Sequence, residues 1–159
     1  MMRNKLLEAI EDCNRAIDQL KLPHALLFIE QVSHALADCF AAGNKVILAG
    51  NGGSLCDVAH FAEELTGVFR QVRPALPAIA LTDAGHLTCT ANDLGFEEVF
   101  KRGVEAYGKP GDVFIGLTTS GNSMNMVRAF HEAKRRELGT IAFLGKDGGR
   151  LKNFADFEF

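Results

Sequence analysis

Residues 45–54 read Lys-Val-Ile-Leu-Ala-Gly-Asn-Gly-Gly-Ser, a short apolar run that leads directly into glycines. A run of this length without polar alternation is typical of a strand buried on both faces of a parallel sheet. Three similar runs occur at 77–81, 112–118 and 140–144, and helical patterns lie between the runs near 54–69, 96–107 and 123–137. Strands that alternate with helices predict right-handed crossovers and a three-layer α/β/α sandwich around a parallel sheet.

The two ends of the chain depart from this alternating pattern. Residues 1–43 carry apolar positions at three- and four-residue steps, interrupted at Pro23, which predicts long N-terminal helices before an α/β core at 44–159. Residues 156–159 alternate as at the opening of a fifth strand. The sequence stops there, so we expect a C-terminal strand, and the helix that would cover this edge of the sheet, to be missing. The whole length, 1–159, suits a single domain.

Composition excludes several classes of protein. The 159 residues carry a net charge of −3, which argues against a general nucleic-acid binder. No apolar stretch approaches the roughly 20 residues that span a bilayer, so we expect no membrane partner. The four cysteines lack zinc-finger spacing and predict reduced thiols, which favours a cytoplasmic location.

A glycine-rich loop follows the first predicted strand. Asn51, Gly52 and Gly53 stand between this strand and a helix that Ser54 is suited to cap. Ligands gather at the carboxyl ends of parallel strands, and the amide groups of a helix N-terminus bind anions. The alternative is a plain glycine turn. The loop has neither the Gly-Lys-Ser/Thr ending of a Walker loop nor the spacing of a dinucleotide-binding loop.

A hydroxyl-rich turn follows the third predicted strand. Its hydroxyls belong to Thr118, Thr119, Ser120 and Ser123. At a helix N-terminus such a turn offers a phosphate several neutral donors, although hydroxyl residues also cap helices routinely. Two loops of this kind, each at the end of a parallel strand, predict a site for one small phosphorylated ligand.

Polar residues on the first crossover helix extend the candidate site. His60 and Glu64 share a helical face with Asp57, a spacing that suits either one metal ion or an acid–base pair. Asn92 and Asp93 come after the second strand, where they could reach the same crevice. The alternative interpretations are a solvated polar stripe on the helix and an ordinary turn after the strand.

Seven segments together resemble the phosphoheptose isomerases, enzymes of the sugar isomerase (SIS) fold with a parallel, flavodoxin-like sheet. The segments follow that family's order and spacing: Gly50–Ser54, His60–Gly67, Arg73–Pro74, Pro77–Ala80, Asn92–Asp93, Ser120–Ser123 and Gly145–Gly149. The likeness covers essentially the whole chain. It implies conversion of sedoheptulose 7-phosphate to D-glycero-D-manno-heptose 7-phosphate through an enediol, for lipopolysaccharide heptose biosynthesis.

The same resemblance implies roles for particular residues. Glu64 would contact the substrate as catalytic base, and His60 and Glu64 would bind one zinc ion, with the other ligands and the acid histidine beyond Phe159. The implied phosphate contacts are Thr118, Thr119, Ser120 and Ser123, and the implied sugar contacts are Asn51, Gly52, Gly53, Asn92 and Asp93. The family's assembly is a homotetramer. The chain departs from the family pattern at Leu55, in place of a polar residue, and at Thr118, in place of serine.

Three other functions stay open on the sequence. A non-enzymatic SIS-fold regulatory protein that binds a replication initiator would lack the paired glutamates Glu63 and Glu64. A sugar-phosphate sensor would carry an attached helix-turn-helix segment, and none is present in the sequence. An isomerase of another sugar phosphate would share the same loops, so the pocket alone would distinguish it.

Overall fold

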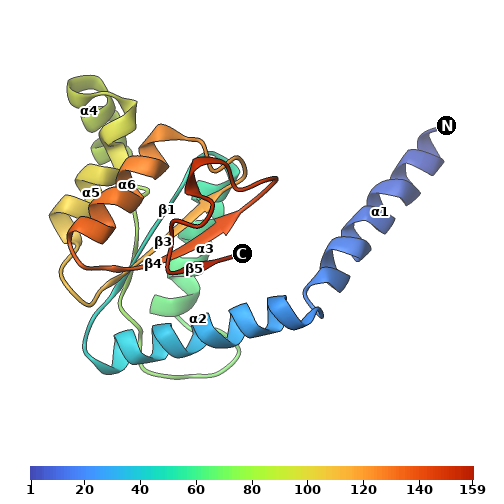
Figure 1. The fold of residues 1–159 in the computed structure, drawn as a ribbon, viewed down its shortest axis with the longest axis horizontal. Helices are drawn as coiled ribbons and strands as arrows, with labels where there is room; N and C mark the ends of the chain where they lie inside the picture. The colour runs from blue at the N-terminus through green and yellow to red at the C-terminus, as the bar shows by residue number, and fades with distance from the viewer.

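A computed structural model describes residues 1–159 and has a five-stranded parallel sheet between layers of helices (Figure 1). The strands are β1 (Val46–Gly50), β2 (Ala78–Ala80), β3 (Val113–Thr118), β4 (Gly139–Leu144) and β5 (Phe157–Glu158). The helices are α1 (Met2–Gln19), α2 (Pro23–Ala41), α3 (Gly53–Thr66), α4 (Ala84–Leu94), α5 (Val99–Tyr107) and α6 (Met124–Arg135), with the 3-10 turns η1 (Phe96–Glu98) and η2 (Gly149–Leu151). The predicted α/β/α sandwich is confirmed.

The strand order β2-β1-β3-β4-β5 places the reversal of direction between β1 and β3. From β1 the chain moves outward to β2 and then returns to the other side of β1 to form β3. Gly50 is in register with Leu117, so the loops that follow β1 and β3 leave the sheet side by side. Open α/β sheets bind ligands at such a switch point. The predicted glycine loop and hydroxyl-rich turn therefore meet where the topology favours a site.

Each face of the sheet has its own apolar core. On one face, α2 and α3 pack against the strands through side chains that include Phe28, Val32, Val58 and Ala62. On the other face, α5 and α6 contribute the side chains of Phe100, Val104, Met126 and Phe130. All five residues of β1 are buried, as an unbroken apolar run predicts for a strand covered on both sides.

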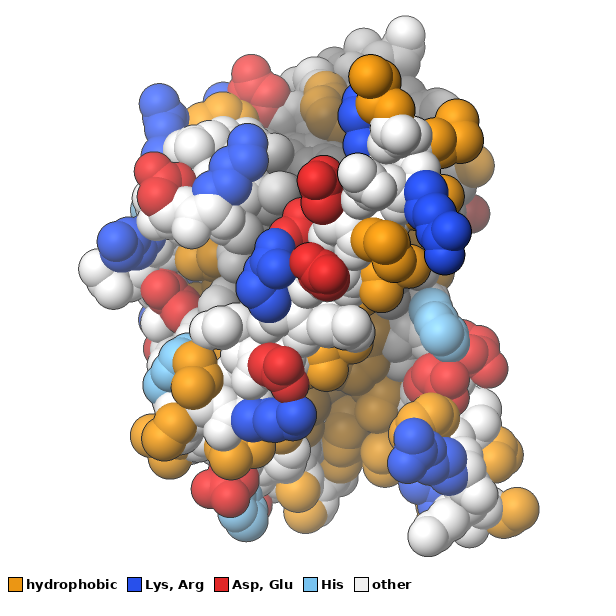
Figure 2. Space-filling model, turned by 90° about the vertical axis from the view of Figure 1, so that its right-hand side faces the viewer, with side chains coloured by type: hydrophobic (Ala, Val, Ile, Leu, Met, Phe, Trp, Pro, Cys, Tyr) orange, Lys and Arg blue, Asp and Glu red, His pale blue; other side chains and the backbone are white.

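The first helix belongs to neither core. None of the residues of α1 is buried, and the helix projects from the body of the molecule (Figure 1). Its apolar positions, which include Leu6, Ile10 and Ile17, are more than half exposed. Figure 2 views the molecule from the side on which α1 projects, and hydrophobic side chains line a hollow on this face. None of the helices is both long enough and apolar enough to cross a membrane.

Helix boundaries in the N-terminal half confirm most of the predicted signals. Pro23 occupies the first position of α2, where its fixed φ and missing N–H cost nothing. Gly43, at φ +75°, follows the end of α2 as a left-handed terminating residue. The capping role predicted for Ser54 is wrong, because α3 begins at Gly53 and Gly52, at φ +58°, takes the cap position. This left-handed conformation favours glycine over serine.

Two further expectations are corrected by the structure. Asn92 and Asp93 lie on α4 and not in a turn, because Asp83 starts a helix there by accepting a hydrogen bond from the His86 N–H at 2.7 Å. The C-terminal strand expected to be missing is present in part: the opening of a fifth strand predicted at 156–159 is confirmed by the two residues of β5, with Phe157 opposite Ile141 of β4.

Candidate functional site

The loops after β1 and β3 enclose a small polar cavity of about 150 Å³. It is lined by Asn51, Ser54, Leu117, Thr118, Thr119, Ser120 and Ser123. The two predicted loops are therefore brought together, as the sequence indicated. Thr118 is mostly buried, and its Oγ1 accepts a hydrogen bond from the Gly121 N–H at 3.3 Å, so this hydroxyl also shapes the turn.

The segment after β4 supports the hydroxyl-rich turn from behind. Asn122 donates from Nδ2 to the Ser120 carbonyl at 2.9 Å and accepts at Oδ1 from the Arg150 N–H at 3.1 Å. Gly121, at φ +62°, lies so close to Gly148 that a Cβ there would be 1.8 Å from the Gly148 carbonyl oxygen. The turn is thus fixed on two sides, and only glycine fits at its centre.

A second hollow, of about 480 Å³, opens beside the first. It is lined by Asn51, Gly52, Phe96, Glu97, Ser123, Met124 and Asn125. Asn51 and Ser123 border both spaces, so a ligand whose phosphate occupies the small cavity has room for the rest of its chain here.

The predicted sugar contacts on α4 are not brought to these cavities. Asn92 donates to the carboxylate of Asp93 at 2.7 Å, and the Cys89 thiol donates to the same carboxylate at 3.4 Å. The hydrogen bond to Asp93 raises the pKa of the Cys89 thiol. Both Asn92 and Asp93 are exposed and line neither space. Their contact with a ligand stays a prediction.

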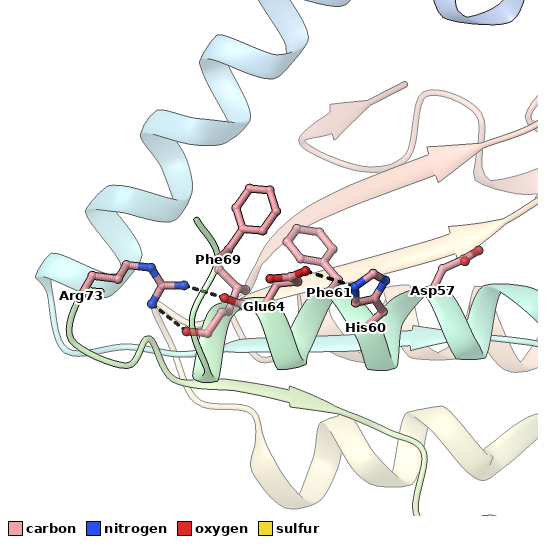
Figure 3. A pocket seen from close by; sticks show the side chains of 7 residues that line it. Asp57, His60, Phe61, Glu64, Phe69 and Arg73 are labelled. Carbon is pink, nitrogen blue, oxygen red and sulfur yellow. Dashed lines mark hydrogen bonds and ion pairs between the residues drawn. The ribbon is translucent and has the colours of Figure 1, made fainter. Parts of the chain in front are cut away.

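A third cavity, of about 440 Å³, lies along the outer side of α3 (Figure 3). It is lined by Asp57, His60, Phe61, Glu64, Leu65, Phe69 and Arg73. His60 Nε2 lies 3.1 Å from Glu64 Oε1, which confirms that the two side chains meet across one helical turn. The Glu64 side chain is 30% exposed and the His60 side chain 72% exposed. The Glu64 side chain therefore lies in the wall of a partly apolar cavity and is partly exposed to solvent.

Arg73 secures the end of α3 beneath this cavity. Its guanidinium donates to the carbonyls of Glu64 at 2.6 Å and Leu65 at 2.9 Å, and also to the carbonyl of Pro74 at 3.0 Å (Figure 3). The last carbonyl groups of a helix have no N–H partner within the helix, so Arg73 provides the hydrogen-bond donors for two of them. Arg73 thereby fixes the backbone that carries Glu64.

Comparison with known proteins identifies the family. Residues 10–145 match the SIS domain family. The phosphoheptose isomerase of Fusobacterium nucleatum is 56% identical over 130 residues, which are 82% of this chain and 67% of that protein. The phosphoheptose isomerase of Escherichia fergusonii is 46% identical over 158 residues, 99% of this chain and 81% of that protein. The chain belongs to the phosphoheptose isomerase family.

A solved structure of this family has the same fold. The phosphoheptose isomerase from Francisella tularensis superposes with a TM-score of 0.93 at 35% identity, covering 99% of this chain and 84% of that one. The resemblance stated from seven sequence segments is thus confirmed. Leu55, the departure from the family pattern, is partly buried and packs against both apolar cores, so it serves the interior and not a ligand.

One feature of the site differs from the sequence-based expectation. We expected His60 and Glu64 to face the same crevice as the glycine loop, but in the single chain they line a separate cavity. Ser54 and Glu64 are ten residues apart on α3. A helix rises 1.5 Å per residue, so the backbone of Glu64 lies about 15 Å along the helix axis from that of Ser54, which lines the small cavity.

The donor atoms around Glu64 fit part of a zinc site. Ligand atoms about 2.1 Å from a tetrahedral zinc ion lie roughly 3.4 Å from one another, close to the 3.1 Å between His60 Nε2 and Glu64 Oε1. Glu63 adds a second carboxylate as a third possible ligand, and ligand atoms of all three residues lie within 4.8 Å of one another. Sequence reasoning named only two of these residues as ligands.

Proposed function

We propose that this protein isomerises sedoheptulose 7-phosphate to D-glycero-D-manno-heptose 7-phosphate, in the cytoplasm, for lipopolysaccharide heptose biosynthesis. The observation that carries the proposal is the hydroxyl-lined cavity at the switch point of a phosphoheptose isomerase fold. Thr119, Ser120 and Ser123 supply neutral donors for the phosphate, with Thr118 behind them. Asn51, Gly52 and Gly53 supply contacts to the sugar, together with Asn92 and Asp93 of α4.

The chemistry requires a base for the proton on C1 and a proton donor for O2, and it needs no external oxidant or reductant. Glu64 takes the proton from C1 of the ketose, which breaks the C1–H bond and forms an enediol. The same proton, or one exchanged with water, is delivered to C2, while the O1 hydroxyl proton leaves and O2 is protonated to give the aldose. A partly buried carboxylate next to apolar side chains suits this role.

Zinc is part of the proposal. His60 and Glu64 would hold the ion, with Glu63 close enough to join them. When bound, zinc would polarise the substrate carbonyl and stabilise the charge of the enediol. The wild-type protein should bind zinc more tightly than His60→Ala, measured by calorimetry with the metal alone. Equal affinity in the two proteins would contradict the assignment of His60.

A homotetramer is the assembly we propose. The exposed apolar stripe of α1 lacks any partner within the chain, and helix-on-helix contact between copies would cover it. Residues 1–43 and 44–159 then act as one domain, because α2 packs on the sheet through Phe28 and Val32. Assembly would also bring a base to the phosphate cavity, since about 15 Å of helix separates Ser54 from Glu64 within one copy and Glu64 of one copy could serve the sugar held by another.

The test is turnover of sedoheptulose 7-phosphate by the purified protein, with Glu64→Gln and Glu63→Gln compared. Glu64→Gln should lower kcat by about 10²-fold or more while KM stays similar, as expected for loss of a general base. Glu63→Gln, which removes only the possible third zinc ligand, should lower kcat less than Glu64→Gln does. Turnover by Glu64→Gln at the wild-type rate would contradict the role of Glu64. A hexose or pentose phosphate as the preferred substrate would favour the alternative isomerase.

The non-enzymatic alternative makes the opposite prediction. A regulatory SIS-fold protein that binds a replication initiator would turn over no sugar phosphate in any variant. Binding of the initiator by a protein without isomerase activity would therefore replace the proposal.

A further inference from the structure

Two asparagines tie the glycine loop to the start of α6. Asn51 Nδ2 donates to Asn125 Oδ1 at 3.0 Å, and Asn125 Nδ2 donates back to Asn51 Oδ1 at 2.8 Å. The two residues are 74 positions apart in the sequence: Asn51 lies in the loop after β1, and Asn125 lies in the first turn of α6. The side chain of Asn125 is 2% exposed, whereas Asn51 borders both ligand spaces.

A backbone group determines which way both amides face. The Met126 N–H points at Asn125 Oδ1 at 2.9 Å while also bonding to the Ser123 carbonyl. Since an N–H can only donate, this atom of Asn125 must be the oxygen and the other must be the NH₂ group. The reciprocal bonds then require Nδ2 of Asn51 to face the oxygen of Asn125, and Oδ1 of Asn51 to face the nitrogen. A flipped amide in either residue would set donor against donor.

The pair leaves Asn51 with a defined set of free groups. Each amide has two N–H donors and two carbonyl lone pairs, and the reciprocal bonds use one of each. Asn51 therefore presents one N–H and one lone pair to a ligand, in an orientation that α6 holds. Without Asn125, the amide would rotate about its last torsion, which is broad, and would lose this fixed polarity.

We infer that Asn125 is a positioning residue, which acts on the sugar phosphate only through the orientation of Asn51. The inference rests on the proposed function, because it assigns Asn51 to the sugar. Preorganised donors gain affinity by avoiding the ordering cost that a mobile side chain meets on binding. Removing Asn125 should weaken binding of sedoheptulose 7-phosphate about tenfold, without any direct contact being lost.

The experiment is a double-mutant cycle on the full chain with Asn51→Ala, Asn125→Ala and both together. Each single change should raise KM, and Asn125→Ala should add nothing once Asn51 is alanine, because the effect passes through Asn51. Asn125→Asp, which keeps the shape and the acceptor for Met126 but loses the donor to Asn51, should also raise KM. Thr140→Val removes an equally buried polar contact, to Asp156, at the opposite end of the sheet and should leave KM unchanged.

A second measurement reports directly on the hydrogen bonds between Asn51 and Asn125. The side-chain amide protons of Asn51 should exchange with water at least tenfold faster in Asn125→Ala than in the wild type, by NMR. Unchanged exchange, or additive effects on KM in an active enzyme, would overturn the inference while the proposed function stands. A wild-type protein that neither binds nor converts a sugar phosphate would overturn the proposed function, and with it the role of Asn51.

Discussion

Replacing Gly121 by alanine tests whether the segment after β4 holds the hydroxyl-rich turn in place. A Cβ on Gly121 would lie 1.8 Å from the Gly148 carbonyl oxygen, whereas real Cβ contacts are essentially never under 3.0 Å. The neighbouring atoms are backbone, so no flexible side chain can move aside. Either the turn or the segment that begins at Gly145 must shift by more than 1 Å.

The magnitude follows from two separate contributions. Alanine in the left-handed region at φ +62° costs about 1–2 kcal/mol. Forcing extra volume into a packed contact costs about 1–3 kcal/mol more. Each kcal/mol lowers Tm by about 2–4 °C in a domain of this size, so Gly121→Ala should melt roughly 4–20 °C below the wild type. Misplacing substrate-binding groups by about 1 Å can cost about 10²-fold in rate, so kcat/KM should fall steeply as well.

Gly43→Ala is the matched control. Gly43 has φ +75°, and a Cβ there would have nothing within 4 Å. This variant therefore has the cost of alanine in a left-handed conformation but no steric clash. Its Tm should fall by only about 2–8 °C, with kcat/KM unchanged. Thermal melting and steady-state kinetics with sedoheptulose 7-phosphate measure both effects. Equal Tm losses for the two variants, with normal kinetics for Gly121→Ala, would refute the reasoning.

Three further outcomes are expected. Ser120→Ala combined with Ser123→Ala should raise KM for a phosphorylated sugar much more than it changes kcat, and an unchanged KM would place the phosphate elsewhere. Hydrogen bonds from Arg135 lower the pKa of the buried Glu132 carboxyl, so its stabilisation is present above about pH 4.3 and is lost as pH falls through the lowered pKa. Glu132→Gln should therefore lower the free energy of unfolding by about 1.5–3 kcal/mol at pH 7, measured with denaturant. The loss of stability of this variant between pH 7 and acid pH should be smaller than that of the wild type. Ile10→Glu should reduce the mass of the assembly in analytical ultracentrifugation, and an unchanged mass would exclude α1 from the interface.

The sequence predicted the architecture because its signals were local. The strands were evident as apolar runs, and Pro23 marked the boundary between the two N-terminal helices within a few residues. The exception, α4, was not predicted although Leu87, Ala91 and Leu94 recur at helical spacing, because Gly85 and two threonines lower the helix propensity of this short segment. The cap at Asp83 is a local signal for the start of this helix, whereas the packing of α4 against η1 and α5 depends on the tertiary fold.

In the candidate site, too, local contacts were predictable from the sequence and contacts between distant segments were not. The approach of His60 to Glu64 was predictable because residues four apart on a helix lie side by side, and helical geometry alone sets that distance. The bond between Asn51 and Asn125 was not predictable, since it depends on the register of β1 against β3 and on where α6 begins.

The separation of Glu64 from the hydroxyl-rich turn also depends on three-dimensional structure and not on local sequence. Glu64 lies on α3, and the glycine loop that borders the same small cavity as the turn precedes this helix, but a helix of 14 residues carries its last turns well away from the loop where it starts. Nearness in sequence to a ligand loop thus predicts a shared cavity only for about the first two helical turns. Glu64 lies beyond that limit, and α1 leaves an apolar stripe uncovered in the same single chain. Assembly of copies would resolve both features at once, so oligomeric state and activity should be lost together when α1 is disrupted.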